Sequence, residues 1–445
     1  MRYNEAIEWL LTFADFERSG RFQERPDVAP VVALLHCLGD PHLGRRTVHL
    51  AGSKGKGSVS AMVESIARAA ALNTGLFTSP HLHDYTERIG VNGGAVSRDT
   101  FARLADGVRA AADDVLPDLG DRRFVTFDLL TAMGFLAFRE EGAGVQVIEV
   151  GLGGRVDSTN VFKSKDVAVI TPLSYEHTTI LGDRIEQIAA EKAAIITPGC
   201  TAVMAPQAYP EAAAVVRGFA TKAGAKLIEV ERDYTWTVGE RDLRRQAVTI
   251  ERRAGRIEAR LPLLGDFQAE NATTAVAAVD ALGIADDEAI VRGLESVIWP
   301  GRMEVLRERP LVIADGAHNA DSARRLRETL ASHFAVSGVT FIIGSGSDKD
   351  VAGLARELAP IAGGVIATRS QHPRAMDPPL ICDAFEAEGV PCEDVDTVAR
   401  AIDMAIDDTD EGGVICLAGS LFVAAEARDY FHKQTIEPAG GVHGG

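Results

Sequence analysis

The sequence predicts an α/β protein with two domains. Its 445 residues are long for a single core, so two domains are the natural expectation. Short runs rich in β-branched residues, which are typical of buried parallel strands, alternate with segments of helical spacing. A Trp-Pro-Gly-Arg stretch at 299–302 interrupts this pattern, and a new alternation begins after it. We expect a P-loop-type, doubly wound N-terminal domain at 1–297, a smaller Rossmann-like C-terminal domain at 298–435 and a disordered Gly-rich tail at 436–445.

The individual elements follow from the same patterns. Residues 124–138 have helical spacing with an apolar stripe, which more often packs in a core than binds a ligand. The stretch 234–262 combines β-formers with glycines at turns and predicts a β-hairpin. A further helix is expected at 185–196, and buried strands at 47–50, 74–79, 145–150, 167–171, 339–344, 364–368 and 414–418. The strands of the second domain lack a Gly-x-Gly-x-x-Gly fingerprint, which argues against a dinucleotide cofactor.

The composition is that of a globular protein. Apolar residues make up 46% of the chain and charged residues 25%, and no apolar run reaches the ~18–20 residues of a membrane span. The N-terminus contains acidic residues and is typical of an amphipathic helix, not of a signal peptide. A net charge of −18 argues against a nucleic-acid partner but not against small anions, which local cations can bind. We expect a cytoplasmic monomer that binds small molecules and neither nucleic acid nor membrane.

The cysteines give no sign of a cross-link or a metal site. The chain has five, at positions 37, 200, 382, 392 and 416, and they are scattered without metal-ligand spacing. Their odd number and wide separation predict reduced thiols in a cytoplasmic protein.

Residues 47–60 have the layout of a phosphate-binding loop. A β-prone run leads into a glycine-rich turn, a lysine, a hydroxyl residue and a helical segment. Glycines let the backbone approach an oxyanion, which the free N–H groups of the helix start then face. In this layout Lys56 reaches the β- and γ-phosphates and the Ser58 hydroxyl holds Mg²⁺. Gly57 separates the two, unlike in the standard P-loop. An ordinary surface turn is the alternative, but the position between a strand and a helix favours phosphate.

A lone carboxylate interrupts an otherwise apolar strand. Glu149 lies near the end of the run 145–150, directly before a glycine-rich segment. A buried carboxylate is costly unless it is paired or bound to a cation. A salt bridge to an arginine would satisfy it. The alternative is a Mg²⁺ site beside the phosphate loop, because Mg²⁺ takes a few oxygen ligands and shares the nucleotide phosphates.

Two strings resemble one enzyme family closely. The loop at 52–58 resembles the Gly-Thr-Asn-Gly-Lys-Gly-Ser loop of folylpolyglutamate synthases and dihydrofolate synthases, within the Mur ligase superfamily. Ser53 and Lys54 stand where that family usually has Thr and Asn. The string at 149–160 is similar to the family's Glu-Val-Gly-Leu-Gly-Gly-Arg-x-Asp-x-Thr-Asn almost residue for residue. The resemblance covers nearly the whole chain, with its motifs in the same order.

The resemblance implies an ATP site. The family pattern Gly-x-x-Gln-x-x-Asn-Ala recurs at 265–272, and its Gln and Asn lie near the nucleotide base. The family's hinge arginine, here Arg302, reaches the ATP phosphates from the second domain, comparable to an arginine finger in cis. The residues implied for ATP are Gly52, Ser53, Gly55, Lys56, Gly57, Ser58, Gln268, Asn271, Arg302 and Asp315.

The resemblance also implies two Mg²⁺ ions. The first is held by Ser58 and Glu149. The second is held by His177 and by Lys192, which is carbamylated in many Mur ligases. Glu176 replaces the family's Asp before this His. From residue types alone, a single His is usually a satisfied polar side chain and a helix Lys is usually exposed.

An acceptor site is implied by further strings. Thr-Ser-Pro-His-Leu at 78–82, followed by Glu-Arg-Ile at 87–89, matches the family's folate-proximal loop, although on residue types alone these are ordinary loop residues. Asp128 replaces the family's Glu in the Thr-x-Phe-Glu stretch near the pterin. The residues implied for substrate are Ser79, Pro80, His81, Arg88, Thr126, Phe127, Arg155, Asp157, His318 and Ser420. The catalytic residues implied are Lys56, Lys192, His177 and His318.

The expected function is ATP-dependent ligation of L-glutamate to a folate-type carboxylate through an acyl phosphate. ATP is the co-substrate, and the C-terminal domain positions glutamate. Dihydropteroate and reduced folates both stay open as acceptors, because pocket shape decides between them. The alternatives are a Mur-type ligase for another acceptor and a P-loop switch or motor. The departures at Lys54, Asp128 and Glu176 also leave a non-catalytic relative open.

Overall fold

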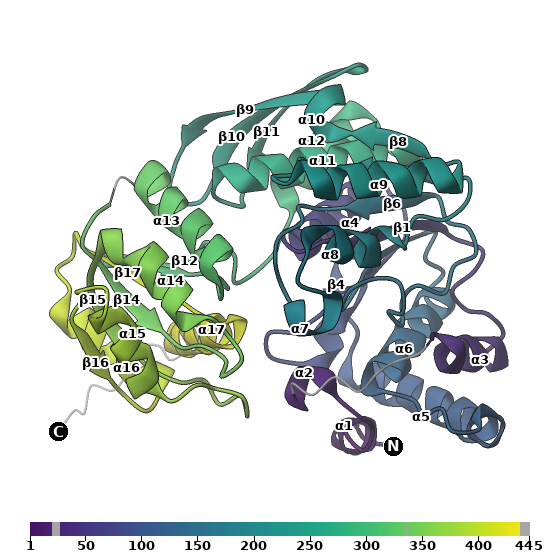
Figure 1. The fold of residues 1–445 in the computed structure, drawn as a ribbon, viewed down its shortest axis with the longest axis horizontal. Coiled ribbons are helices and arrows are strands. Elements are labelled where there is room, and N and C mark those ends of the chain that lie inside the picture. Colours follow the sequence, from purple (N-terminus) through teal and green to yellow (C-terminus); the bar gives the residue numbers. More distant parts are fainter. Residues whose placement is uncertain (20–26, 335, 437–445) are drawn as a thin grey trace, which may run out of the picture. The chain divides into compact units, whose positions relative to one another are not determined.

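The structure is a computed structural model that describes residues 1–19, 27–334 and 336–436. The chain forms two compact units (Figure 1). The first comprises residues 1–240, 247–262 and 267–298, and the second comprises 241–246, 263–266 and the chain from 299 onward. The disordered tail predicted at 436–445 lies outside the described residues beyond Ile436.

Two short segments group with the second unit, although we expected a continuous N-terminal domain up to residue 297. They are 241–246 and 263–266. Ion pairs between residues distant in sequence hold them there. Arg241 pairs with Asp266 at 2.5 Å, and Arg244 pairs with Glu308 at 3.0 Å.

The first unit is built on an eight-stranded sheet in the order β4-β3-β2-β5-β1-β6-β7-β8. The strands from β2 to β8 in this order run parallel, and β3 and β4 add an antiparallel edge. Their bounds are β1 Arg46–Ala51, β2 Thr74–Phe77, β3 Ile89–Val91, β4 Gly94–Ala95, β5 Val145–Glu149, β6 Val167–Ile170, β7 Thr201–Met204 and β8 Lys226–Glu229. β1 therefore lies in the middle of the sheet, between β5 and β6, and delivers the chain to the glycine-rich turn.

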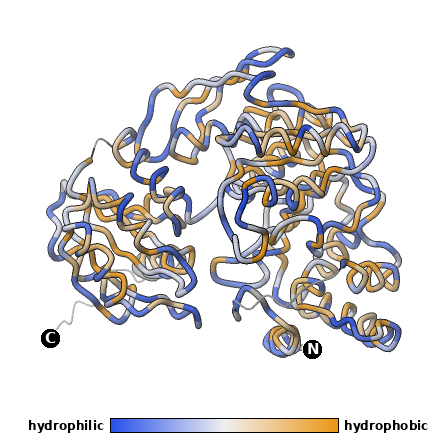
Figure 2. Tube along the Cα trace, viewed as in Figure 1, coloured by the Kyte–Doolittle hydropathy of each residue, from blue (hydrophilic) through white to orange (hydrophobic). Residues whose placement is uncertain are grey.

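Helices pack on this sheet through two hydrophobic clusters. One joins Phe77 and Ile148 to α1, α3, α5 and α6, and the other joins Ala168 and Ile170 to α8 and α9. Hydrophobic and hydrophilic residues alternate along these helices (Figure 2). The helices are α1 Tyr3–Leu10, α2 Phe16–Ser19, α3 Ala29–Cys37, α4 Lys56–Ala69, α5 Arg98–Val115, α6 Thr126–Glu140, α7 Thr178–Leu181, α8 Ile185–Ala193, α9 Pro210–Ala223, α10 Val230–Asp233, α11 Asp266–Leu282 and α12 Asp287–Ser296. The doubly wound fold expected from the strand pattern is present.

The predicted hairpin at 234–262 is a three-stranded sheet. Its strands are β9 Tyr234–Arg241, β10 Gln246–Arg252 and β11 Gly255–Leu261, in the order β11-β10-β9. The tip between β9 and β10 is the segment 241–246 that groups with the second unit.

The second unit has a six-stranded sheet in the order β12-β13-β17-β14-β15-β16. β12 is antiparallel to β13, and the other neighbours run parallel. The strands are β12 Glu304–Glu308, β13 Leu311–Ala314, β14 Val339–Ile343, β15 Ala362–Ala367, β16 Cys392–Asp394 and β17 Val414–Ala418. The helices are α13 Ala320–Phe334, α14 Val351–Leu358, α15 Pro378–Glu386, α16 Val398–Asp408 and α17 Leu421–Ile436. β14, β15 and β17 lie where the sequence pattern predicted strands, whereas β12 and β16 were not predicted.

The expectation that all cysteines are reduced was wrong for one pair. Cys382 on α15 and Cys392 on β16 form a disulfide, with their Cα atoms 5.2 Å apart. The turn after α15 brings the chain back along β15, and this places the two side chains within bonding reach. Cys37, Cys200 and Cys416 are free. Among the described residues, no helix is both long and apolar enough to cross a membrane.

Helix α12 supports α4, the helix that follows the glycine-rich turn. A Cβ added at Gly293 on α12 would lie 2.4 Å from the Ile66 Cα on α4. The Ser65 hydroxyl of α4 also donates to the Gly293 carbonyl oxygen at 2.7 Å. The two helices therefore meet backbone to backbone at a position that leaves no room for a side chain.

We expect Gly293→Ala to destabilise the protein by about 1–3 kcal/mol, because the added methyl group overpacks a contact with backbone that cannot rotate away. Gly218→Ala is the matched control: Gly218 is also helical, but nothing lies within 4 Å of its added Cβ. That substitution should be neutral or stabilising by up to ~1 kcal/mol through helix propensity. Urea denaturation of both variants measures the difference, and equal free energies of unfolding would contradict the close packing.

Candidate functional site

The turn between β1 and α4 is held against the segment after β6. The backbone N–H groups of Ser53 and Lys54 donate to the Pro172 carbonyl oxygen at 3.0 and 3.1 Å. Gly55 precedes α4 with φ +81°, and a Cβ there would lie 2.4 Å from the Asn271 Oδ1. Only glycine meets both requirements, so Gly55 lets the backbone turn sharply into the start of α4. Gly57 lies in the first turn of α4. This is the geometry of an anion-binding site.

Two lysines converge on one carbonyl of this turn. The Nζ atoms of Lys56 and Lys192 donate to the Gly52 carbonyl oxygen at 3.0 and 2.8 Å. Lys56 folds back over the turn from the start of α4, whereas Lys192 comes from the last turn of α8. The structure thus brings together two residues that the sequence separates widely, and concentrates positive charge at the turn before α4.

The residues expected near the nucleotide base lie beside the same turn. The Gln268 side-chain amide donates to the Ser58 hydroxyl at 3.4 Å, and the Asn271 amide donates to the Gln268 Oε1 at 2.9 Å. All three side chains are buried. This chain of hydrogen bonds links α11 to the start of α4 and orients the Ser58 hydroxyl.

Glu149 ends β5, the strand next to β1, and Leu50 lies opposite it in the register. It is buried, and its Oε2 accepts the Ser79 backbone N–H at 3.3 Å. Ser58 offers a hydroxyl and Glu149 a carboxylate, and the two come from neighbouring elements. Mg²⁺ prefers oxygen ligands and takes only a few of them from the protein. The residues at this position therefore fit a Mg²⁺ ion that is shared with a nucleotide.

The residues expected at a second Mg²⁺ fit less well. Lys192 is buried rather than exposed, and its Nζ donates to the Glu176 Oε1 at 2.7 Å. An amine that donates in this way is not a metal ligand. Burial by itself would raise the pKa of Glu176. Four neighbouring charges have a larger combined effect and lower this pKa to about 2; they are those of Lys192, Lys56, Lys54 and His177. The structure gives Glu176 a role as the counter-charge of the lysines, and carbamylated Lys192 stays a prediction.

The loop after β2 holds His81 and Arg88 together. The Arg88 Nε donates to the His81 Nδ1 at 2.9 Å, and the rings of His81 and Tyr85 lie 4.3 Å apart. Arg88 is buried, and its guanidinium donates to Glu17 at 3.2 and 2.5 Å. Because Arg88 can only donate, the His81 Nδ1 is unprotonated. Burial first and the Arg88 charge second lower the pKa of His81 to about 4.

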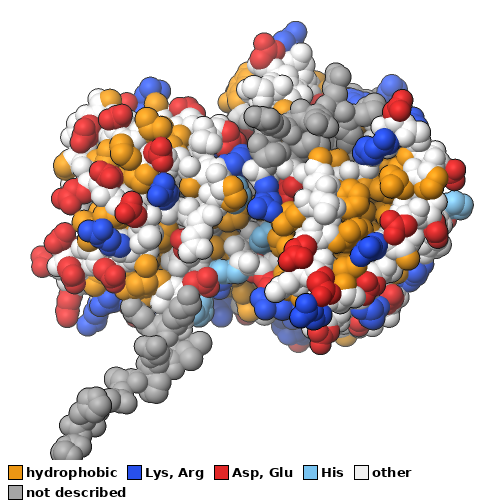
Figure 3. Space-filling view, turned by 90° about the horizontal axis from the view of Figure 1, so that it is seen from below, with side chains coloured by type: hydrophobic (Ala, Val, Ile, Leu, Met, Phe, Trp, Pro, Cys, Tyr) orange, Lys and Arg blue, Asp and Glu red, His pale blue; other side chains and the backbone are white. Residues whose placement is uncertain are grey.

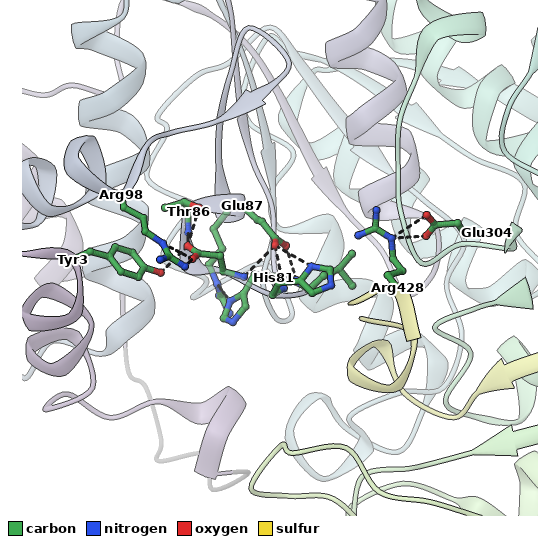
Figure 4. Close-up of polar contacts among 11 residues, drawn as sticks. Tyr3, His81, Thr86, Glu87, Arg98, Glu304 and Arg428 are labelled. Carbon is green, nitrogen blue, oxygen red and sulfur yellow. Dashed lines mark hydrogen bonds and ion pairs between the residues drawn. The ribbon is translucent and has the colours of Figure 1, made fainter. Parts of the chain in front are cut away.

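Two carboxylates fix the shape of this loop (Figure 4). Asp84 accepts from the Tyr3 hydroxyl at 2.6 Å, from the Thr86 backbone N–H at 3.0 Å and from Arg98 at 2.7 Å. These bonds outweigh the effect of burial and lower the pKa of Asp84 to about 2. Glu87 accepts three successive backbone N–H groups, those of residues 82–84, at 2.7, 3.0 and 3.0 Å. The loop is therefore rigid before any ligand binds.

The other residues of the first unit that were predicted to bind the acceptor make different kinds of contact within the protein. The Thr126 hydroxyl donates to the Leu10 carbonyl oxygen at 3.0 Å, which is a packing role. Phe127 covers Gly151, where an added Cβ would lie 2.7 Å from its ring. Arg155 pairs with Glu191 on α8 at 2.8 Å.

Asp157 closes the segment 151–160 on itself. It accepts the Leu152 N–H at 3.0 Å and the Thr159 N–H at 2.9 Å. The neighbouring Ser158 hydroxyl donates to Asp128 at 2.9 Å, so the carboxylate that replaces the expected Glu is also engaged.

In the second unit, the predicted residues follow β13 and β17, which are neighbouring parallel strands. Asp315 accepts the backbone N–H groups of Met303 and Ala317 at 2.9 and 2.8 Å, and burial raises its pKa despite the nearby Arg302. The His318 Nδ1 contacts the Gly316 carbonyl oxygen at 2.9 Å. The Gly419 N–H donates to the Ala317 carbonyl oxygen at 2.7 Å, which brings the segment carrying Ser420 beside the one carrying His318.

The Ser420 hydroxyl accepts the Phe422 N–H at 3.1 Å at the start of α17. The same unit contains the ion pair between Glu304 and Arg428 that Figure 4 shows.

Known proteins are similar in sequence to this chain over almost its whole length. The dihydrofolate synthase/folylpolyglutamate synthase of Mycobacterium tuberculosis is 32% identical over 442 residues, covering 92% of this chain and 90% of the relative. The chain belongs to the folylpolyglutamate synthase/dihydrofolate synthase family. Residues 123–279 match the Mur ligase middle domain, and residues 301–421 match the Mur ligase glutamate ligase domain.

A solved folylpolyglutamate synthase has the same fold. The crystal structure of the Mycobacterium tuberculosis enzyme complexed with ADP and AMPPCP has a TM-score of 0.85 at 33% identity, covering 96% of this chain and 99% of that one. A longer relative also belongs to the comparison. A probable bifunctional folylpolyglutamate synthase/dihydropteroate synthase of Halobacterium salinarum is 36% identical over 98% of this chain and 52% of its own length. The chain thus spans about half of that relative.

The site residues expected from folylpolyglutamate synthase motifs lie in the places described above. Two side chains that contact them, Glu17 and Tyr85, were not predicted from the sequence. Glu17 precedes Arg88 by 71 positions, and no local pattern connects them. The Tyr85 ring contacts the His81 ring at a tilt of 43°, four positions away in the sequence. The only sequence signal for Tyr85 was an aromatic residue inside the family's loop.

The charge of Arg88 should contribute to keeping His81 neutral. We expect Arg88→Met to raise the pKa of His81 from about 4 towards its ordinary value of 6.5, with burial still holding the pKa below that value. Imidazole NMR signals of the two proteins, followed against pH and assigned with His81→Gln, measure this. Arg103→Met is the control, because Arg103 pairs with Glu140 on the surface. An unchanged pKa of His81 in Arg88→Met would show that burial alone sets the pKa.

The ion pair of Glu176 and Lys192 should be strongly coupled. Lys192→Met leaves a largely buried carboxylate without its closest partner and should cost about 3–5 kcal/mol, whereas the double variant with Glu176→Gln should cost less than the sum of the two single changes. The folded pKa of Glu176 lies below its ordinary value of 4.5, so this stabilisation is present above pH 4.5 and is lost as the pH falls towards 2. Urea denaturation at several pH values measures it, and additive costs would rule the coupling out.

Proposed function

We propose that the protein is an ATP-dependent ligase that joins L-glutamate to the carboxylate of a folate-type acceptor. The observation that carries this proposal is the phosphate turn with Lys56 and Ser58, beside the strand that ends in Glu149, in a chain of this family. The acceptor is dihydropteroate, a reduced folate or both. A Mur-type ligase that uses another acceptor and a non-catalytic relative are outcomes that the experiment below separates from it.

The chemistry begins with an unreactive carboxylate. Transfer of the γ-phosphoryl group of ATP converts it to an acyl phosphate and releases ADP. The amine of glutamate then attacks the acyl carbon, and the amide bond forms as inorganic phosphate leaves. The backbone N–H groups at the start of α4 hold the phosphates, and Lys56 exchanges its bond to the Gly52 carbonyl for one to a phosphate oxygen. When bound, Mg²⁺ on Ser58 and Glu149 neutralises charge on the phosphates. Most of the catalysis is placement, because little covalent chemistry falls to the protein.

The acceptor binds beside the rigid loop after β2. His81 and Tyr85 offer two neighbouring aromatic rings, and a flat heterocycle can pack against one of them. The Ser79 N–H binds Glu149, so this loop and the Mg²⁺ ligand are directly connected. Arg155 and Asp157 belong to the neighbouring segment 151–160, and Phe127 packs against it. In the second unit, His318 and Ser420 bind glutamate, and Arg302 and Asp315 act toward ATP.

We also infer that the partners are small molecules only and that the enzyme works as a monomer in the cytoplasm. The net charge of −18 supports the absence of a nucleic-acid partner. Acidic and basic side chains are interspersed on the face shown in Figure 3. The use of ATP supports the cytoplasm. The disulfide between Cys382 and Cys392 is unusual there, since cytosolic thiols are generally kept reduced.

ADP release should require both L-glutamate and an acceptor. The assay uses MgATP and L-glutamate with dihydropteroate or tetrahydrofolate in separate reactions. Lys56→Met should lower turnover by about 100-fold or more, because it removes a cation from the developing phosphate charge. Arg103→Met, a surface change, should have no effect. Absence of turnover with either acceptor, while ATP still binds, would overturn the folate assignment; turnover of another carboxylate would indicate a different acceptor class.

A further inference from the structure

A buried lysine and a buried histidine lie outside all the roles assigned above. His49 is in the middle of β1 and is fully buried, and Lys165 precedes β6 with 8% of its surface exposed. Buried lysines are rare unless they are paired, so this lysine needs an explanation. Its Nζ lies 2.7 Å from the His49 Nδ1.

This pair is the start of a continuous chain of hydrogen bonds. The His49 Nε2 lies 2.9 Å from the Thr159 hydroxyl oxygen. The Thr159 hydroxyl in turn donates to the Asp157 Oδ1 at 2.5 Å. His49, Thr159 and Asp157 are all buried. The chain thus runs from Lys165, through the strand that leads to the phosphate turn, to the carboxylate that closes the segment 151–160.

The donors and acceptors of this chain of hydrogen bonds can be arranged in only one way. Both Asp157 oxygens already accept backbone N–H groups, so the Thr159 hydroxyl hydrogen points to Asp157. The Thr159 oxygen must then accept from His49, which requires a hydrogen on the His49 Nε2. The opposite nitrogen, Nδ1, is therefore bare and accepts from Lys165. Each group between the ends uses one donor and one acceptor, so a single tautomer satisfies the chain.

The electrostatics agree with this arrangement. Burial lowers the pKa of Lys165 to about 7, with Cys200 opposing the shift. Burial, and then the charge of Lys165, lower the pKa of His49 well below its ordinary value, which keeps the ring neutral. Asp157 supplies the carboxylate at the far end.

We propose that Lys165 and His49 are positioning residues that fix the orientation of Asp157, and through it the segment 151–160, for acceptor binding. Neither residue touches the substrate. Lys165 selects the His49 tautomer, His49 orients the Thr159 hydroxyl, and that hydroxyl fixes the Asp157 carboxylate that holds the Leu152 N–H. The link to acceptor binding rests on the proposed function, whereas the orientation of Asp157 does not.

The test compares Lys165→Met with Lys165→Gln. Methionine removes the donor to His49, whereas the glutamine amide can still donate. We expect Lys165→Met to raise the KM for the acceptor by up to about tenfold, the effect of one lost hydrogen bond, with the KM for ATP unchanged. Lys165→Gln should recover most of the loss. Lys163→Met is the matched control, since Lys163 is an exposed lysine two positions away.

Two readouts do not depend on the acceptor. Amide hydrogen exchange at Leu152 and Thr159, whose N–H groups bind Asp157, should be faster in Lys165→Met than in the wild type. The ¹⁵N shifts of wild-type His49 should show a hydrogen on Nε2 and none on Nδ1. A hydrogen on Nδ1, unchanged exchange, or equal losses in both Lys165 variants would overturn the proposal. Absence of folate ligase activity with the expected exchange and tautomer would overturn only the proposed function.

Discussion

The carbonyl oxygen of Gly52 accepts hydrogen bonds from two ammonium groups, those of Lys56 and Lys192. Two like charges on one acceptor repel, so this arrangement needs negative charge nearby. Glu176 provides it from the other side of Lys192. Glu176 lies among the charges of Lys192, Lys56 and Lys54, and a bound polyphosphate would add further negative charge beside them. The glycines, the sheet order and the support of α12 all serve to keep this turn open and fixed.

The loops around the site are rigid because carboxylates bind their backbone. Asp84, Glu87, Asp157 and Asp315 each accept two or more hydrogen bonds from N–H or O–H groups. A loop fixed in this way loses little conformational entropy when a ligand binds. The large number of acidic residues in the chain is thus partly explained by local structure and not only by the surface.

The sequence predicted well what depends on contiguous residues. Many of the strands, and the glycine-rich turn between β1 and α4, follow from local strings. Contacts between distant segments were not predictable: Glu17 with Arg88, Cys382 with Cys392, and Lys165 with His49 have no periodicity or spacing that connects them. Resemblance to a family also assigned Thr126 and Arg155 to substrate, and their side chains turn out to have packing and ion-pair partners within the protein.

The support of α4 by α12 has a consequence for how the chain is made. Ser65 and Gly293, which meet at this contact, are 228 positions apart. At a synthesis rate of about 5–20 residues per second, the ribosome adds that stretch in roughly 10–45 s. During this interval the residues of α4 have been synthesised, but the helix that covers one side of α4 has not. Chaperones that bind exposed apolar surface can bind the uncovered side of α4 during this interval, before the last helices of the unit emerge.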